Sequence, residues 1–426
     1  MNQSFLRLLT PGAALLVLAT AGCSIPSKRA LDQRRDHVYV RYWPPQDDGR
    51  LRLAVKDLID MKGEVTTAGS EYLLKNSPPA KRDAACLAHA RGPNVQIVGK
   101  TTTTELAVGV TGINQYFGTP KNPITPDYRQ VPGGSSSGSA VAVANGSADV
   151  AIGTDTAGSI RVPAACCGVY GLKTTFGLIP LDGVYPISPT HLDTVGPLAK
   201  DIPRLVQGMD LLQPGFTGKY AAAEAAKPSA KRIRIGRLYV SGTDPRIEQA
   251  IDDVLAARGF QVVKLGADFE EAWKQAESDA RAVAASNAWV YDAKFAPLPG
   301  VRPRTKAVFT LGHLQWDTTY HECLARQPAW RTTLDAALKK VDFIALPTMK
   351  ALPPHIPLLG GTVAFEARFL GWQNTAAVNF AGNPAIAVPI PVQDRRIPVT
   401  SLQLIGKRRG EADLVNAGRL IADSRK

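Results

Sequence analysis

The chain has 426 residues, of which 45% are hydrophobic and 20% charged, and this is the composition of a globular protein long enough for a sizeable core. Its formal net charge is +13, but the lysines and arginines are scattered, and no zinc-finger or aromatic-basic motif accompanies them. We therefore expect a solvated basic surface and no nucleic-acid partner.

The N-terminal stretch MNQSFLRLLTPGAALLVLATAGCSIPS holds one arginine before an apolar run from Leu8 to Ala21. The run is short for a bilayer span and ends in small residues, which is typical of an export signal. Thr20-Ala21-Gly22-Cys23 resembles a bacterial lipoprotein signal, in which the cysteine is lipidated and becomes the new N-terminus. We expect residues 1–22 to be this signal and a lipid on Cys23 to anchor a periplasmic protein to the membrane. Ordinary secretion and an uncleaved anchor are the alternatives.

The next residues, 23–48, are polar and rich in arginine and proline, and we interpret them as a tether in front of one domain over residues 49–426. Apolar runs and helical spacing then predict an alternation of strands and helices. In chain order these are a strand in LRLAVKDLID, a helix in DAACLAHARG, a strand in NVQIVGK, a helix in SGSAVAVANG ended by Gly146, and a strand in ADVAIGTDT. This alternation indicates an α/β fold.

The second half of the chain continues the same alternation after a predicted surface connection at Pro214–Arg232. A strand in RIRIGRLYV precedes a helix in PRIEQAIDDVLAARGF, which we expect to stop at Gly259, and a strand in QVVKL. Helices are predicted at Glu270–Lys294 and Ala329–Lys340, and buried strands in VDFIALPT and PAIAVPI. We prefer a single domain, because neither side of the connection looks self-sufficient.

Two short motifs suggest chemistry that the rest of the sequence does not complete. Gly134-Ser135-Ser136-Ser137-Gly138 matches the G-x-S-x-G nucleophile elbow with Ser136 at its centre, but none of the six histidines stands in a context that marks it as the base. Gly99-Lys100-Thr101 is like the end of a phosphate-binding loop, whose first glycine position is Asn94 here. The elbow stays open as an alternative, whereas we expect no nucleotide.

The cysteines and histidines do not form a metal-binding pattern. Besides Cys23 the chain has Cys86, Cys166, Cys167 and Cys323, with no C-x-x-C or H-E-x-x-H spacing. We expect the adjacent pair Cys166 and Cys167 to pack as small apolar residues. No metal and no cofactor are expected.

A lysine is the third candidate for the base that activates a serine. Lys56 follows the apolar run LRLAV, where a buried ammonium is disfavoured and its pKa falls. A neutral amine of this kind accepts the proton that a serine hydroxyl does not release unaided. Alone, however, such a lysine would more readily be a surface residue at a strand end.

Lys56 does not stand alone, because a long stretch resembles the signature of the amidase signature family of serine hydrolases. The resemblance lies in AVKDLIDMKGEVTTAGS, VGKTTTTELA, GGSSSGSAVAVANGSADVAIGTDTAGSIRVPAACCGVYGLKTTFG, HLDTVGPLAKDI, FIALPT, AGNPAIAVPIP and SLQLIGKRRGEADLV. The family's triad of serine, cis-serine and lysine maps onto Ser159, Ser135 and Lys56, with the two serines 24 residues apart. The resemblance implies a large mixed central sheet covered by helices on both faces.

The resemblance also implies the roles of the remaining site residues. Ser159 is the expected nucleophile, and the backbone N–H groups of Thr156, Ala157 and Gly158 are expected to form the oxyanion hole. Supporting roles are expected for Ser136, Thr154, Asp155 and Arg161. Two residues depart from the family pattern: Ala157 replaces the usual glycine beside the nucleophile, and Thr174 replaces a common proline.

We therefore expect an amidase that hydrolyses a small amide or peptide amide through an acyl-enzyme. The alternatives are an inactive amidase-like binding protein at the cell envelope, an esterase or hydrolase that uses Ser136, and a component of a tRNA-dependent amidotransferase, which the export signal disfavours. Specificity is expected to lie in Ala267–Leu370, where aromatic residues are candidates to line an acyl pocket although core packing is the commoner role. They are Trp289, Tyr291, Trp316, Phe365 and Phe369.

Overall fold

The computed structural model describes residues 35–227, 229–358 and 362–422. The predicted signal peptide, residues 1–22, and the predicted lipidation site Cys23 lie outside the described residues. Among the helices of the described ranges, none is both long and apolar enough to span a bilayer.

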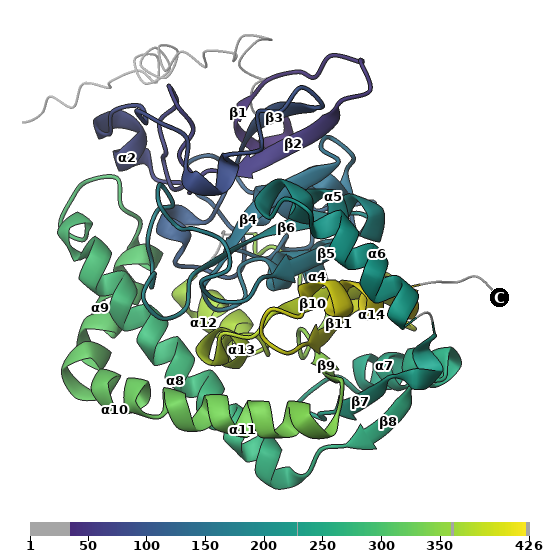
Figure 1. Cartoon of the computed structure of the whole chain (residues 1–426). Coiled ribbons are helices and arrows are strands. Elements are labelled where there is room, and N and C mark those ends of the chain that lie inside the picture. Colours follow the sequence, from purple (N-terminus) through teal and green to yellow (C-terminus); the bar gives the residue numbers. More distant parts are fainter. Residues whose placement is uncertain (1–34, 228, 359–361, 423–426) are drawn as a thin grey trace, which may run out of the picture.

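One mixed sheet runs through the whole described chain (Figure 1). Its 11 strands among these residues follow the order β1-β3-β2-β4-β6-β5-β10-β11-β9-β7-β8. β2 is parallel to both β3 and β4, whereas β4, β6, β5, β10, β11 and β9 are successively antiparallel. The strands are β1 (Tyr39–Tyr42), β2 (Leu51–Lys56), β3 (Val95–Thr101), β4 (Val150–Asp155), β5 (Tyr170–Lys173), β6 (Thr194–Ala199), β7 (Arg234–Arg237), β8 (Gln261–Lys264), β9 (Phe343–Pro347), β10 (Ala385–Pro391) and β11 (Val399–Ile405).

Helices cover both faces of this sheet. In Figure 1, α5, α6 and α14 lie together in front of its middle, and α8 to α11 form a group at the lower left. The helices are α2 (Glu71–Asn76), α3 (Ser137–Ala144), α4 (Arg161–Cys167), α5 (Ile202–Leu212), α6 (Phe216–Ala226), α7 (Pro245–Arg258), α8 (Ala267–Asp292), α9 (Pro303–Thr318), α10 (Tyr320–Ala325), α11 (Gln327–Lys340), α12 (Val363–Leu370), α13 (Ala376–Ala381) and α14 (Glu411–Ala422).

The alternation of side chains along β2 shows how the two faces are filled. Leu53 and Val55 pack into one core with residues of α5, α7 and α14, whereas Ala54 packs on the opposite face against α3 and α4. Both faces of β2 are therefore buried, and its last residue, Lys56, lies in the interior of the protein. The single α/β domain predicted from the sequence is confirmed.

Most of the predicted elements are present. β2, β3, β4, β7, β8, β9 and β10 and the helices α3, α7, α8 and α11 are formed where the sequence predicts them. Gly259 ends α7 in the left-handed region at φ 77°, as its position in the sequence suggests.

The helix predicted in DAACLAHARG is wrong, because only the 3-10 turn Ala85–Leu87 is formed. The amide of Ala84 donates to the carbonyl of Asp60, and that of Ala85 donates to the carbonyl of Asp182. These two bonds tie the start of the stretch to distant segments, and Cys86 and Leu87 enter the core.

Two predicted boundaries are also wrong. The expected surface connection Pro214–Arg232 contains helix α6, whose alanine-rich sequence favours a helix and whose Phe216 is buried in the core. The expected tether does not extend to residue 48, because β1 pairs with β3 and the side chains of Tyr39 and Tyr42 are buried. The folded part of the chain thus begins before residue 49.

Candidate active site

Lys56 is fully buried at the end of β2, and its amine is surrounded by oxygen atoms. Its Nζ lies 2.8 Å from Ser135 Oγ and 2.9 Å from Thr154 Oγ1. Burial lowers the pKa of Lys56 to about 7, while the carboxylates of Asp155 and Asp193 act in the opposite direction. An amine with this pKa is largely neutral above neutral pH and is suited to accept a proton.

Ser135 is held in place by its backbone. The peptide bond between Gly134 and Ser135 is cis, and Gly133 has φ of +71°, where a Cβ would lie 2.8 Å from Pro163 Cα. The Ser135 carbonyl accepts hydrogen bonds from Thr103 Oγ1 at 2.8 Å and from the amide of Ser137 at 2.9 Å. The Ser135 hydroxyl is thereby fixed against Lys56.

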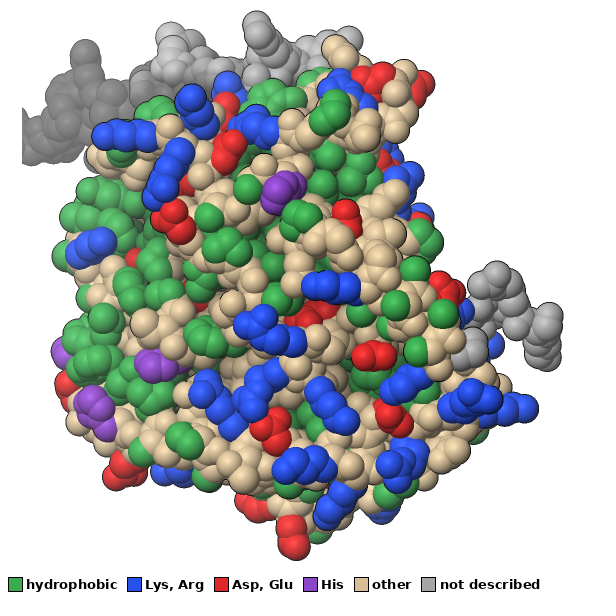
Figure 2. Space-filling model, viewed as in Figure 1, with side chains coloured by type: hydrophobic (Ala, Val, Ile, Leu, Met, Phe, Trp, Pro, Cys, Tyr) green, Lys and Arg blue, Asp and Glu red, His purple; other side chains and the backbone are tan. Residues whose placement is uncertain are grey.

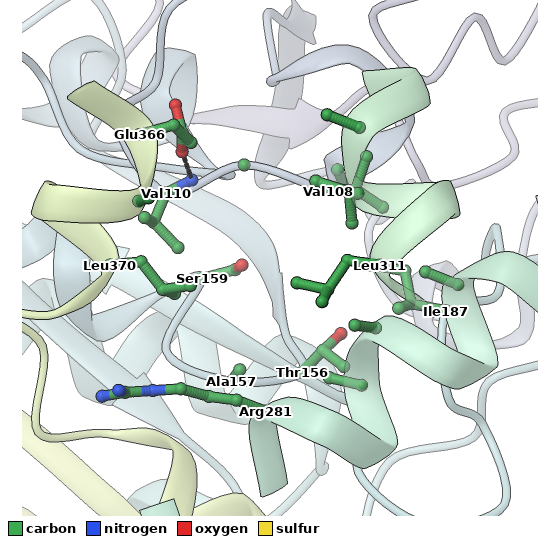
Figure 3. A pocket seen from close by; sticks show the side chains of 18 of the residues that line it. Val108, Val110, Thr156, Ala157, Ser159, Ile187, Arg281, Leu311, Glu366 and Leu370 are labelled. Carbon is green, nitrogen blue, oxygen red and sulfur yellow. Dashed lines mark hydrogen bonds between the residues drawn. The ribbon is translucent and has the colours of Figure 1, made fainter. Parts of the chain in front are cut away.

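Ser159 follows β4 in a short loop that leads into α4. Its side chain is 7% exposed, and Figure 3 shows its oxygen pointing into a pocket. Its carbonyl accepts a hydrogen bond from the amide of Ser136 at 3.2 Å, which ties the two serine loops together. No protein group in the described ranges bonds to the Ser159 hydroxyl, so this oxygen is free to meet a ligand.

Asp155 and Arg161 form a buried ion pair behind the loop of Ser159. Arg161 Nη2 lies 2.9 Å from Asp155 Oδ1, and Arg161 also donates to Gln403 Oε1 and to the carbonyl of Thr375. Burial disfavours the carboxylate of Asp155, but the Arg161 guanidinium, the Lys173 amine and the hydrogen bond from Asn379 together hold the pKa of Asp155 below its ordinary value. Both side chains are fully buried, so neither reaches the pocket.

The three residues expected to form an oxyanion hole have different surroundings. The amide of Gly158 donates to Asp155 Oδ1 at 2.8 Å, so this N–H already has a partner within the protein. The amides of Thr156 and Ala157 are bonded to no group of the described chain. Gly158 has φ of +134°, and a Cβ there would lie 2.2 Å from Thr375 Oγ1, which explains why the position holds glycine.

Ser136 does not fit the nucleophile of the alternative elbow. It is fully buried, does not line the pocket, and its Oγ donates to the carbonyl of Thr154 at 3.3 Å. None of the six histidines lines the pocket of Ser159.

Asp193 and Thr375, which were not among the residues expected from the sequence, belong to the same cluster. Thr156 Oγ1 donates to Asp193 Oδ1 at 2.6 Å, and burial raises the pKa of Asp193. Thr375 Oγ1 donates to the carbonyl of Ala157 at 2.6 Å and fixes the backbone beside Ser159. Asp193 stands in the stretch HLDTVGPLAKDI that carries part of the resemblance, and its place in this motif is the sequence signal that could have identified it as a site residue.

The pocket beside Ser159 has a volume of about 470 Å³ and is lined mainly by small and aliphatic side chains. They come from the segment 107–110 and from α8, α9 and α12, so the region 267–370 does contribute most of the lining. The candidate aromatic residues do not line it: Trp289, Tyr291, Trp316, Phe365 and Phe369 are absent from its wall, in keeping with core packing as their commoner role. Trp316 instead stacks on Tyr320, and Phe369 packs edge-on against Trp372.

The two departures from the family pattern occupy different environments. Ala157 lines the pocket next to Ser159, so its methyl group takes up space at the reacting centre. Thr174 is buried away from the pocket, and its hydroxyl donates to the carbonyl of Val195 at 2.8 Å.

The chain is similar in sequence and in fold to known proteins of one family. A sequence profile of the family described as Amidase matches residues 51–415. A glutamyl-tRNA(Gln) amidotransferase subunit of Halobacterium salinarum is 32% identical over 423 residues, which cover 87% of this chain and 94% of that relative. The 2-amino-5-chloromuconic acid deaminase of Comamonas testosteroni is 35% identical over 381 residues, covering 86% of this chain and 79% of the relative.

The fold agrees with the sequence matches. An inhibitor-bound structure from work on the origins of an s-triazine catabolic enzyme superposes with a TM-score of 0.78 at 27% identity, covering 93% of this chain and 88% of that one. The profile match spans all the strands from β2 to β11 and every residue of the cluster around Lys56. The chain therefore belongs to the amidase family.

Proposed function

We propose that this protein hydrolyses the C–N bond of a carboxamide through an acyl-enzyme on Ser159, with Ser135 as proton relay and Lys56 as base. The observation that carries the proposal is the buried amine of Lys56, 2.8 Å from Ser135 Oγ and without a carboxylate partner in direct contact. With a pKa of about 7, this amine is neutral in a large fraction of molecules at neutral pH. An imidazole is not needed.

The contact between Lys56 and Ser135 supports the first step of the proposed proton route, and the step between Ser135 and Ser159 is part of the proposal. Lys56 Nζ takes the proton of Ser135 Oγ, Ser135 takes the proton of Ser159 Oγ, and Ser159 attacks the amide carbonyl carbon. The tetrahedral intermediate collapses when the C–N bond breaks and the relay returns the proton to the leaving nitrogen. A water molecule then attacks the ester of Ser159, with the relay removing its proton, and releases the acid.

The free backbone amides of Thr156 and Ala157 are the donors we assign to the oxyanion. A preorganised donor of this kind stabilises the transition state by about 2.7–4 kcal/mol. The Gly158 amide has a different task, because its bond to Asp155 holds the loop that presents the other two. Thr154 supports the lysine and Ser136 supports Thr154, both through hydrogen bonds.

Labelling with a fluorophosphonate tests the nucleophile directly. We expect one adduct, located on Ser159 by peptide mass spectrometry, and none in Ser159→Ala, with circular dichroism verifying that the variant folds. The matched variant Ser136→Ala retains labelling, with a smaller loss of rate. Labelling that survives in Ser159→Ala and disappears in Ser136→Ala would return the function to the elbow serine, and a chain with no reactive serine would be a binding protein.

A role as one component of an amidotransferase is the second candidate, favoured by the similarity to the relative from Halobacterium salinarum. The two functions differ in what the isolated chain does. We expect the purified protein to hydrolyse simple amides without any other protein. Ammonia release that requires added amidotransferase components would favour the second candidate.

The place of the protein in the cell is a separate proposal that rests on the sequence before residue 35. We propose that the chain is exported and lipidated on Cys23, because an apolar run and small residues precede this cysteine. Metabolic labelling with a palmitate analogue tests it. The wild type is expected to carry the label in the membrane fraction and Cys23→Ala to lack it, whereas an unlabelled wild type would contradict the proposal.

A further inference from the structure

Three helices build the wall of the pocket with the same kind of surface. α8 contributes Ala284, Ala285 and Ala288, α9 contributes Ala307, Val308 and Leu311, and α12 contributes Val363, Ala367 and Leu370. These spacings of three and four residues place each set on one face of its helix. The alanines leave space, and the larger aliphatic residues supply apolar contacts. Val108, Val110 and Ile187 extend this surface beside Ser159 (Figure 3).

The charged residues of the wall are matched within the protein. Arg281 pairs with Glu277 at 2.8 Å, and Lys274 pairs with Glu270 at 3.0 Å. Arg304 lies 3.4 Å from Glu366, whose carboxylate also accepts the hydroxyl of Thr111 at 2.6 Å. Each of these cations therefore has a carboxylate neighbour that offsets its charge, whereas the buried donor atoms Arg281 Nε and Arg304 Nη1 have no hydrogen-bond partner among the described residues.

We propose that this pocket holds the uncharged aliphatic or arylalkyl group on the carbonyl side of the substrate amide. The proposal rests on the proposed function, because it takes Ser159 as the atom that attacks the carbonyl. A volume of about 470 Å³ accommodates a medium-length chain and is larger than an acetyl group requires.

The mouth of the pocket lies where α9 and α12 approach the surface. Leu311 is 48% exposed and Val363 is 49% exposed although both line the cavity. Figure 2 shows hydrophobic side chains gathered on the left of the molecule, over the region of α9 in Figure 1. A substrate chain that passes Leu311 covers apolar surface that water otherwise contacts, so binding improves as the chain lengthens.

Rates of inactivation by fluorophosphonates with different alkyl chains test the proposal. The probes carry ethyl, butyl, hexyl and octyl groups on phosphorus, and a carboxybutyl group is the charged counterpart. We expect the second-order rate to rise with each methylene, by up to about fourfold, until the pocket is full. The carboxybutyl probe is expected to react at least about tenfold more slowly than the hexyl probe.

Two leucines on α9 provide matched variants. Leu311 lines the pocket, whereas Leu314 is 61% exposed and lies outside it. We expect Leu311→Glu to slow the octyl probe by about tenfold more than it slows the ethyl probe, since the long chain covers more of the surface that carries the new charge. Leu314→Glu is expected to change neither probe by more than about twofold.

The outcomes separate this inference from the proposed function. Labelling of Ser159 with no preference for longer chains, or with equal rates for the carboxybutyl and hexyl probes, would overturn the apolar pocket and leave the nucleophile intact. Equal effects of Leu311→Glu and Leu314→Glu on the octyl probe would also overturn it. Absence of labelling at Ser159 by every probe would instead overturn the proposed function, and this inference with it.

Discussion

Two fully buried lysines with similar titration but different neighbours show what makes one of them a candidate base. Burial lowers the pKa of Lys56 and that of Lys173 alike to about 7. Lys56 meets the hydroxyls of Ser135 and Thr154, whereas Lys173 donates to the carbonyls of Thr174 and Asn383, each at 2.8 Å. A hydroxyl passes a proton onward and a carbonyl has none to give. A low pKa is thus not sufficient, because the amine must also adjoin a proton relay that leads to a pocket.

The largest effect expected from this comparison is on activity when each lysine is replaced by methionine. Lys56→Met removes the proposed base and is expected to lower kcat/KM for amide hydrolysis by about 10³-fold or more. Lys173→Met, at an equally buried position, is expected to keep kcat/KM within about fivefold per folded molecule. Steady-state kinetics on protein with verified circular dichroism measures both, and equal losses would contradict the distinction.

Ser135→Ala is expected to give the next largest effect. It removes the proposed proton relay, so that Lys56, like Lys173, no longer adjoins one. Thr154 remains beside the amine, but the route from the amine to Ser159 is interrupted. We expect the rate of Ser159 labelling by a fluorophosphonate to fall about 10²-fold or more. A rate within about threefold of the wild type would show that Ser135 carries no proton.

Lys173 is expected to matter for stability. Lys173→Met leaves the buried carbonyls of Thr174 and Asn383 without this donor, and a buried unsatisfied group costs about 1–3 kcal/mol. We expect the free energy of unfolding to fall by about that amount in denaturant titrations at pH 8. An unchanged stability would mean that relief of the buried amine offsets the lost hydrogen bonds.

The smallest expected effect is a shift of the pH-rate profile when a carboxylate near one of the two lysines is replaced. Asp193 raises the pKa of Lys56, so Asp193→Asn is expected to lower it and to move the pH-rate profile to lower pH. Glu411 acts in the same sense on Lys173, and Glu411→Gln is the matched control that leaves the profile in place. Equal shifts from both substitutions would show that the profile does not report Lys56.

The sequence predicts the three proposed catalytic residues, Lys56, Ser135 and Ser159, more completely than the residues that surround them. Lys56 and Ser135 stand in recognisable local patterns, and β2 and the loop before α3 bring them together. Asp193 and Thr375 reach the cluster from the loop before β6 and from the loop before α13, and no local pattern connects those segments to Lys56. The hydrogen bond made by the Gly158 amide depends on the orientation of the Asp155 carboxylate, and the sequence does not specify this orientation.

The pocket illustrates the same limit. Aromatic side chains were candidates to line it, with core packing as the commoner role, and Trp316 and Phe369 do find aromatic partners inside the protein, whereas alanines of α8 face the cavity. A cavity exists where side chains are small, so the residues that create it carry little signal in the sequence. In contrast, the segment that contains α6 does carry a sequence signal. Its alanines favour a helix and its Phe216 favours burial, although its proline, glycine and lysine content suggested a surface connection.

The central claim is that neutral Lys56 activates Ser159 through Ser135, and the pH dependence of Ser159 labelling measures it most directly. Because the pKa of Lys56 is lowered to about 7, the amine is protonated and inactive below that pH and neutral above it. We expect the labelling rate to rise about tenfold per pH unit below pH 7 and to level off above about pH 8, in the wild type and in Lys173→Met. A rate independent of pH between about 5 and 9, or the same inflection in Lys56→Met, would contradict the account.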